Sequence, residues 1–190
     1  MQRTTNPSPL AMTQPETKPT LNVVIAYEDF ETGKHAKGTF DFLVHQLGSE
    51  FQFLNQMWKF DVLGIPKLRD MAAKDAAMAD IIIISSQGQE PALEVKLWVE
   101  SWLALGGHPL ALVALFAGQD CADRESNPAR EYLAEVARRG RLEFFAQPDE
   151  WPGRDASFLL NRAFRINKGA APFMAGRAGH ETHSRWGINE

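Results

Sequence analysis

The sequence predicts an α/β domain of three layers, in which a five-stranded parallel sheet lies between helices on its two faces. Short apolar runs alternate with segments of helical periodicity five times along residues 21–168. Alternation of this kind requires crossover connections between parallel strands. The clearest strand, residues 81–86, begins with four consecutive isoleucines. It has no polar side, so both of its faces must be covered.

The first unit begins with residues 21–27, a β-branched apolar run that is typical of a buried strand. An acidic loop from Glu28 to Lys34 is expected to follow. A helix then ends at Gly48. Its apolar positions recur at helical spacing and comprise Phe40, Leu43, Val44 and Leu47.

The second unit begins with residues 51–63, which alternate only in part between polar and apolar positions. The even positions Leu54, Trp58, Phe60 and Val62 supply the apolar side, and the pattern predicts a strand near the edge of the sheet. Pro66 opens the next helix. The small-residue face of that helix is expected to comprise Leu68, Met71, Ala72, Ala76 and Ala79.

The remaining units follow the same order. After residues 81–86, a helix ends at Gly106-Gly107 and carries an apolar stripe of Val95, Trp98, Val99 and Trp102. Residues 109–116 read as another buried strand, and residues 142–147 read as a fifth strand. Asn127 and Pro128 are a cap and a first-turn proline for the helix between them, and Asp155 caps a last helix. The expected inward positions of these two helices are Tyr132, Leu133, Val136, Ala137, Phe158, Leu159, Ala163 and Ile166.

Five such units favour the flavodoxin-like strand order 2-1-3-4-5, with a Rossmann-type or other α/β order as the alternative. Residues 1–20 are rich in Pro, Thr, Ser, Asn and Gln and are expected to form a disordered leader. Residues 169–190 lack periodicity but carry apolar side chains. We expect this tail to contact the domain or a second subunit.

Composition narrows the possible functions. The formal charge of −4 gives no electrostatic reason to bind nucleic acid or an anionic membrane. No stretch approaches the roughly 20 apolar residues of a membrane span. The single cysteine, Cys121, excludes an intrachain disulfide and fits a reducing compartment. A cytoplasmic, bacterial protein is the expectation.

A ligand crevice is expected beyond the carboxyl ends of the first and third strands, because ligands bind at the switch point of open parallel sheets. No catalytic residue, no cofactor and no metal site can be assigned, and Glu28 and Asp29 are candidates for metal binding. The candidate crevice comprises Glu28, Asp29, Thr32, Gly33, Lys34, Ser85, Ser86, Gly88, Gly118 and Asp120.

The layout of residues 21–168 resembles that of response-regulator receiver domains. The local match is the acidic pair Glu28-Asp29 after the first strand, which in that family helps to hold Mg²⁺; turn and capping duties are its alternative role. The third strand ends in Ser85-Ser86 instead of a phosphoacceptor Asp. Residues 116–118 stand where the family has Thr or Ser, and residues 146–147 where it has Lys. Without a carboxylate nucleophile no aspartyl phosphate can form.

The third-strand region is also similar to that of flavodoxins and flavin-dependent quinone reductases. Gly88 and Pro91 match a loop that touches the isoalloxazine ring in that family, and Thr32-Gly33 matches part of its phosphate loop. The resemblance implies FMN as a cofactor. The carboxylates of the first loop oppose it, because like charges repel a phosphate.

Two functions therefore remain open from the sequence. The first is a non-catalytic, receiver-like or flavodoxin-like domain for signalling, regulation or protein interaction, with a protein partner or a homo-oligomer contacted through residues 169–190. The alternative is an FMN- or nucleotide-binding oxidoreductase that uses the loops after the first and third strands.

Overall fold

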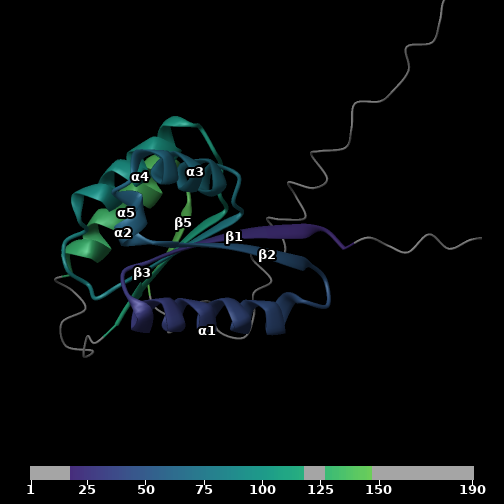
Figure 1. The fold of residues 1–190 in the computed structure, drawn as a ribbon. Helices are drawn as coiled ribbons and strands as arrows, with labels where there is room; N and C mark the ends of the chain where they lie inside the picture. The colour runs from purple at the N-terminus through teal and green to yellow at the C-terminus, as the bar shows by residue number, and fades with distance from the viewer. Residues whose placement is uncertain (1–17, 118–126, 147–190) are drawn as a thin grey trace, which may run out of the picture.

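The sheet has five strands in the order β2-β1-β3-β4-β5, and every neighbouring pair is parallel. The computed structural model describes residues 18–117 and 127–146 (Figure 1). This confirms the predicted fold class and the flavodoxin-like order. The elements are β1 (Thr20–Tyr27), α1 (Phe30–Leu47), β2 (Gln52–Lys59), α2 (Phe60–Leu63), α3 (Pro66–Ala77), β3 (Ile81–Ser86), α4 (Leu93–Ala104), β4 (Ala111–Phe116), α5 (Pro128–Gly140) and β5 (Glu143–Ala146).

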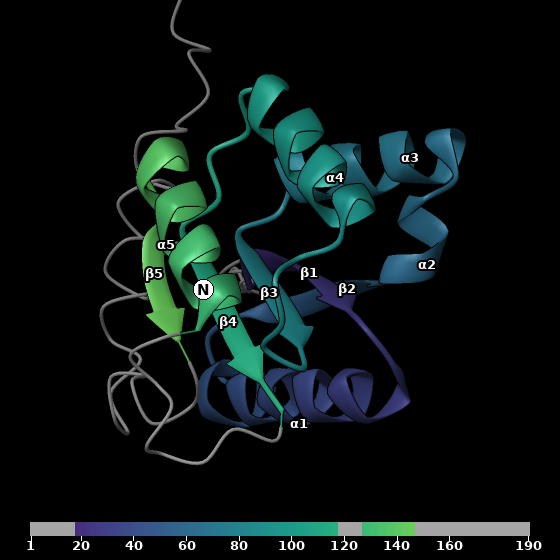
Figure 2. The ribbon, with the colours of Figure 1, turned by 90° about the vertical axis from the view of Figure 1, so that its left-hand side faces the viewer.

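The described helices divide unequally between the two faces of the sheet. Helix α1 lies on one face, and α2 to α5 lie on the other (Figures 1 and 2). The division follows from right-handed crossovers: the connection from β1 to β2 steps across the sheet in one direction, and each later described connection steps in the other. The expected helix from Asp155 lies outside the described residues.

The core lies on both faces of the central strands. All six residues of β3 and all six of β4 are buried, as the continuous apolar runs predict. On the face with four helices, the stripe of α4 packs Trp98 and Trp102 against the sheet with no exposed area. The indole N–H groups of both tryptophans lack a hydrogen-bond partner within the described part of the chain. These two side chains therefore contribute packing.

Helix α1 starts earlier than the sequence suggests. The expected loop from Glu28 to Lys34 is largely the first turn of the helix, because Asp29 is its N-cap. The Asp29 carboxylate accepts the Thr32 N–H at 2.9 Å, and the Thr32 hydroxyl accepts the Asp29 N–H at 2.8 Å. This reciprocal capping box satisfies two N–H groups at the start of the helix.

Residues 51–63 do not form one strand. Strand β2 lies at an edge of the sheet, as predicted, but it ends at Lys59, and residues 60–63 form the short helix α2. Its expected apolar side is also wrong at Leu54, which is 60% exposed. Phe60 and Leu63 are instead buried against the face with four helices. The partial alternation in residues 51–63 therefore came from a strand followed by one helical turn.

The other predicted helix signals are confirmed in part. Pro66 and Pro128 occupy first turns, and the Asn127 side chain accepts the Arg130 N–H at 3.0 Å. In α3, Met71 is exposed and Ala73 is buried in its place, because small side chains allow the helix to approach the sheet closely. Within the described residues, no helix is long and apolar enough to span a bilayer. Most of the expected leader and the whole tail lie outside this part.

Candidate functional site

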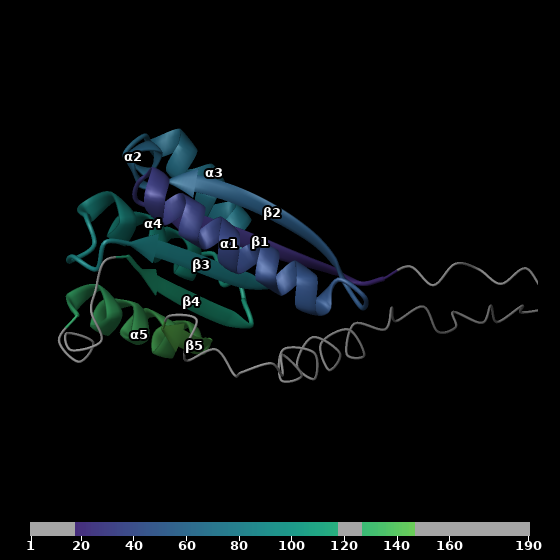
Figure 3. The ribbon, with the colours of Figure 1, turned by 90° about the horizontal axis from the view of Figure 1, so that it is seen from below.

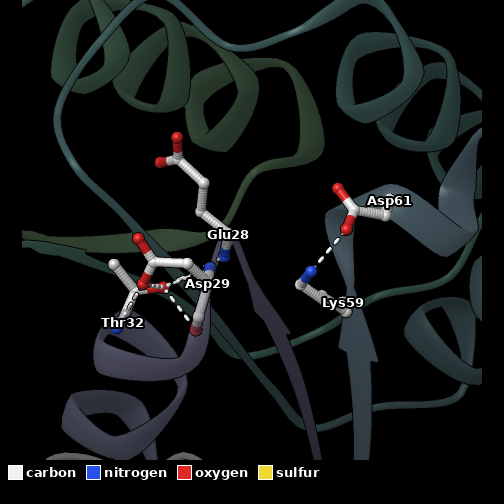
Figure 4. Close-up of polar contacts among 5 residues, drawn as sticks. All are labelled: Glu28, Asp29, Thr32, Lys59 and Asp61. Atoms are coloured by element: carbon white, nitrogen blue, oxygen red, sulfur yellow. Dashed lines mark hydrogen bonds and ion pairs between the residues drawn. The ribbon is translucent and has the colours of Figure 1, made fainter.

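The carboxyl ends of β1, β2 and β3 bring several polar side chains to one edge of the sheet. Figure 4 shows Glu28, Asp29 and Thr32 at the junction of β1 and α1, with Lys59 and Asp61 at the end of β2. Ser85 and Ser86 end β3, which pairs with β1 up to Tyr27 and Ser85. The switch point predicted from the sequence lies between β1 and β3, and the end of β2 lies next to it, on the other side of β1.

Asp29 and Thr32 are bound to each other. Besides the capping box, the Thr32 hydroxyl donates to the Asp29 carboxylate at 3.0 Å and accepts the Glu28 N–H at 3.1 Å. Thr32 has no exposed area. The N–H of Thr32, followed by the side chain of Gln87, lowers the pKa of Asp29 below its ordinary value of 3.8. Asp29 is thus a helix-capping carboxylate.

Glu28 and Gln87 connect the ends of β1 and β3. The Glu28 carboxylate accepts the backbone N–H of Gln87 at 2.7 Å, and the Gln87 amide donates to Asp29 at 2.9 Å. The Glu28 N–H also donates to the carbonyl of Ser85 at 3.1 Å. The acidic pair therefore holds the loop after β3 in place. This supports the capping and turn role that was the alternative to metal binding.

The hydroxyls of the two serines point to opposite faces of the sheet, because successive strand residues alternate. Ser86 follows Ile84 on the face with four helices, and its hydroxyl accepts the Gly88 N–H at 3.3 Å. Gly88 has a φ of 87°, a conformation that glycine adopts without a steric cost. Ser85 is wholly buried, and its hydroxyl has no partner among the described residues.

A cavity of about 180 Å³ opens next to Glu28 and Ser86 on the face with four helices. Its apolar wall includes Phe60, Ile84 and Leu133. The Glu28 side chain points away from Asp29 and Thr32 (Figure 4), and it lines this cavity. Three further carboxylates line it, from Asp61, Glu90 and Glu94. Such a cavity disfavours a phosphate or another anion.

The two ammonium groups next to the cavity are already paired. Lys59 forms an ion pair with Asp61, which raises the pKa of Lys59 above its ordinary value of 10.5 (Figure 4). Lys96 pairs with Glu90 at 2.6 Å, and this hydrogen bond lowers the pKa of Glu90. Each cation is therefore held by a carboxylate before any ligand arrives.

Some predicted site residues lie elsewhere. Gly33 and Lys34 line a separate, open depression on the side of α1, together with Tyr27 and Met57. Gly33 is buried against the Tyr27 ring, so close that a Cβ added there would lie 2.8 Å from a ring carbon. Gly118 and Asp120 lie outside the described residues. Of the predicted set, Glu28 and Ser86 line the cavity, and Asp29 and Thr32 cap α1.

Sequence reasoning missed Lys59, Asp61 and Gln87 as members of this site. The first two were hidden because residues 51–63 read as one strand, whereas Lys59 ends it. The sequence signal that could have indicated the end of the strand is the charged Lys59 after the uncharged residues 52–58. Gln87 was within an expected loop, but nothing in its spacing indicates that it bonds to Asp29, 58 residues earlier.

The chemistry open to this edge is limited. Within the described residues, no group of three acidic, histidine or cysteine side chains is arranged to hold a metal ion. The backbone N–H groups of Asp29, Thr32 and Gly33 all donate within the first turn. Among the described residues, a phosphate would therefore find the ammonium groups of Lys59 and Lys96 already paired and these N–H donors already used.

Comparison with known proteins adds no relative. No protein-family model matches the chain, and no curated protein matches it. Evidence about the function of this protein therefore comes from the geometry of the site and of the surface.

Proposed function

We propose that this chain is a non-catalytic regulatory or protein-interaction domain with a receiver-like layout. The observation that carries the proposal is the hydrogen bonding of the acidic pair. Glu28 and Asp29, which would hold Mg²⁺ in a receiver, instead accept hydrogen bonds from Gln87 and from Thr32. Except for the buried hydroxyl of Ser85, which has no partner among the described residues, the acidic pair and its neighbours bond to one another, and this suits a scaffold better than a reaction centre.

The absence of a suitable nucleophile supports the same proposal. Phosphoryl transfer to a receiver needs a carboxylate at the end of β3 and cations around the transferred group. Ser85 and Ser86 stand at that strand end, and both are buried. The ammonium group of Lys59, at the end of β2, is paired with Asp61. Among the described residues, the end of β3 therefore offers no carboxylate that could accept a phosphate next to the Glu28-Asp29 pair.

The alternative, an FMN-binding oxidoreductase, receives less support from the geometry. A flavin phosphate needs free N–H or hydroxyl donors at the start of α1. Thr32 and Gly33 use theirs in the capping turn, and Glu28 and Asp29 add negative charge. Freshly purified protein is expected to show no visible flavin absorbance. A flavin band that survives dialysis would overturn the proposal.

Phosphorylation gives the direct test. The full chain is incubated with Mg²⁺ and radiolabelled acetyl phosphate, next to a competent receiver domain as a positive control. We expect no acid-stable or hydroxylamine-sensitive label on this chain. Stoichiometric labelling that is lost in Asp29→Asn would show that the pair supports phosphoryl chemistry, and the proposed role would be wrong.

A further inference from the structure

Strand β2 forms an edge of the sheet on which only the last residue, Lys59, is one of the devices that normally protect an edge. It pairs with β1 over all eight residues in a regular register. Figure 3 shows β2 beside β1 at the edge of the sheet. Among the described strands, none pairs with its other side. Residues 52–58 contain no charge and no proline. Edge strands usually carry a lysine, a proline or a bulge that prevents pairing with another chain.

The backbone groups that face outward can be assigned. The Gln52 N–H donates to the Pro19 carbonyl at 2.9 Å, which places the backbone groups of Gln52 on the side of β1. Backbone groups of successive strand residues point to opposite edges. The even-numbered residues of β2 therefore face β1, and Phe53, Asn55 and Met57 present their N–H and C=O groups to the open edge.

Exposed apolar side chains border this edge on both faces. On the side of α1, Met57 is 41% exposed and lies in one depression with Phe30, which is 78% exposed. On the other face Leu54 is 60% exposed, so none of the described helices covers the middle of the strand. Met71 and Met78 are also exposed, and they lie on the same face of α3 as Asp75. Asp75 accepts the indole N–H of Trp58, so this face of α3 is next to β2. Apolar surface gathered in this way marks a contact with another protein.

We propose that two copies of this chain associate by antiparallel pairing of their β2 strands about a twofold axis at Asn55. One continuous sheet would then run through both copies. The proposal names a partner for the interaction role proposed above and rests on that role. A self-complementary contact is the common way in which homodimers close.

The register follows from the residues at the edge. With Asn55 on the axis, residues 52–58 pair completely, and Phe53 lies opposite Met57 of the second copy, twice, on the face of α1. Aromatic and thioether side chains make favourable contacts. If the pairing of the two β2 strands were shifted by two residues toward the C-terminus, Phe53 would lie opposite Lys59 of the second copy. The ammonium group of Lys59 is already paired with Asp61. A shift the other way would require the Phe51 N–H, which already donates to the Leu47 carbonyl.

The outward pairs also match in hydrogen bonding. In this register Phe53, Asn55 and Met57 occupy the hydrogen-bonded sites of the new ladder, where two opposite residues exchange N–H and C=O bonds. The N–H and C=O groups of these three residues point to the open edge, as the hydrogen bond from Gln52 to Pro19 showed. Lys59 and Asp61 remain at the ends of the pairing, in solvent, and keep their ion pair.

Sedimentation of the full chain tests the proposal with matched proline variants. Asn55→Pro removes an outward N–H and leaves the bonds to β1 intact, so a folded protein with at least a tenfold weaker dimer is expected. Gln56→Pro, the control, removes an N–H that faces β1 and should lower the unfolding midpoint instead. A monomeric wild-type chain at all concentrations would overturn the proposal. So would a folded Asn55→Pro dimer, which would indicate another surface, such as residues 169–190.

A cysteine pair tests the register and does not depend on the proline variants being folded. In a Cys121→Ser background, Asn55→Cys is expected to form an intermolecular disulfide on oxidation, because the axis brings the two positions to about 5.5 Å between Cα atoms. Gln56→Cys, the control, should remain reduced, because its symmetry mate lies beyond disulfide reach. Cross-linking of Gln56→Cys alone, or of neither variant, would overturn the register and the proposal.

A third variant uses charge. Asn55→Lys places two ammonium groups opposite each other only in the dimer, so it should dissociate the dimer at low salt and partly restore it at high salt. Failure of these tests is distinguishable from failure of the proposed function. A monomer without phosphate label refutes the dimer alone. A labelled dimer refutes the non-catalytic role and leaves the β2 contact standing.

Discussion

Replacing Thr32 by valine should separate the structural use of the acidic pair from any ligand-binding use. Thr32 has no exposed area, and valine keeps its shape but loses the hydroxyl. That hydroxyl accepts the Asp29 N–H and donates to the Asp29 carboxylate. The Glu28 N–H would lose one of two hydrogen bonds on this substitution, because it also donates to the carbonyl of Ser85.

The expected loss has two parts. An unsatisfied N–H at Asp29 costs about 1–3 kcal/mol, and a lost hydrogen bond to a carboxylate costs about 1.5–3 kcal/mol. Because the two share one site and are not additive, we expect the free energy of unfolding to fall by about 3 kcal/mol for Thr32→Val. Thr32→Ser keeps the hydroxyl and loses one buried methyl group, which costs about 1 kcal/mol.

Urea unfolding followed by circular dichroism measures both variants. The structural reasoning requires Thr32→Val to be clearly less stable than Thr32→Ser, with the same dependence on denaturant. Equal stabilities for the two variants would mean that the capping box contributes little. The Thr32 hydroxyl would then be free for another role, and the interpretation of the site would be wrong.

The remaining predictions concern stability elsewhere in the domain. Burial raises the pKa of Asp80 above its ordinary value of 3.8, although its carboxylate accepts the Asn22 N–H at 2.7 Å. The folded state therefore holds this proton longer than the unfolded state, and stability falls as the pH rises from about 3.8 through the raised pKa. Asp80→Asn should remove that fall and stabilise the protein at neutral pH, which urea titrations at several pH values will check; an unchanged pH profile would contradict the assignment. Gly107→Ala should destabilise by about 3 kcal/mol, because its Cβ would lie 2.2 Å from the Ala77 carbonyl oxygen. Gly38→Ala, on the exposed side of α1 with no atom near its Cβ, should stabilise by about 1 kcal/mol, and similar thermal midpoints for the two variants would refute the argument.

The sequence was most informative where a local pattern reports burial directly. Four isoleucines in β3 and the stripe of Val95, Trp98, Val99 and Trp102 in α4 identified their elements and buried faces. Asn127 and Pro128 identified the start of α5, because a cap and a first-turn proline act within a few residues. Such signals depend on neighbours in the chain.

The same reasoning failed where two neighbouring patterns overlapped. Residues 51–63 looked like one alternating strand, because Phe60 and Val62 continued the even positions of β2. Packing against the face with four helices buried Phe60 and Leu63 and turned the chain into α2. The sequence could not weigh that burial against strand pairing. The end of β2, and with it the Lys59–Asp61 pair, was therefore missed.

The sequence by itself determined the alternation of strands and helices, except for α2, and the parallel sheet, and it predicted the edge at which a site would lie. Only the tertiary structure decided what the polar residues at that edge do. Glu28 meets Gln87 across 59 residues, and the outward groups of β2 follow from a bond between Gln52 and Pro19. Periodicity in the sequence indicates which side chains of an element are buried. A hydrogen bond requires that two atoms, here from residues far apart in the sequence, lie within about 3 Å of each other. That distance is set by register and packing, which no local pattern contains.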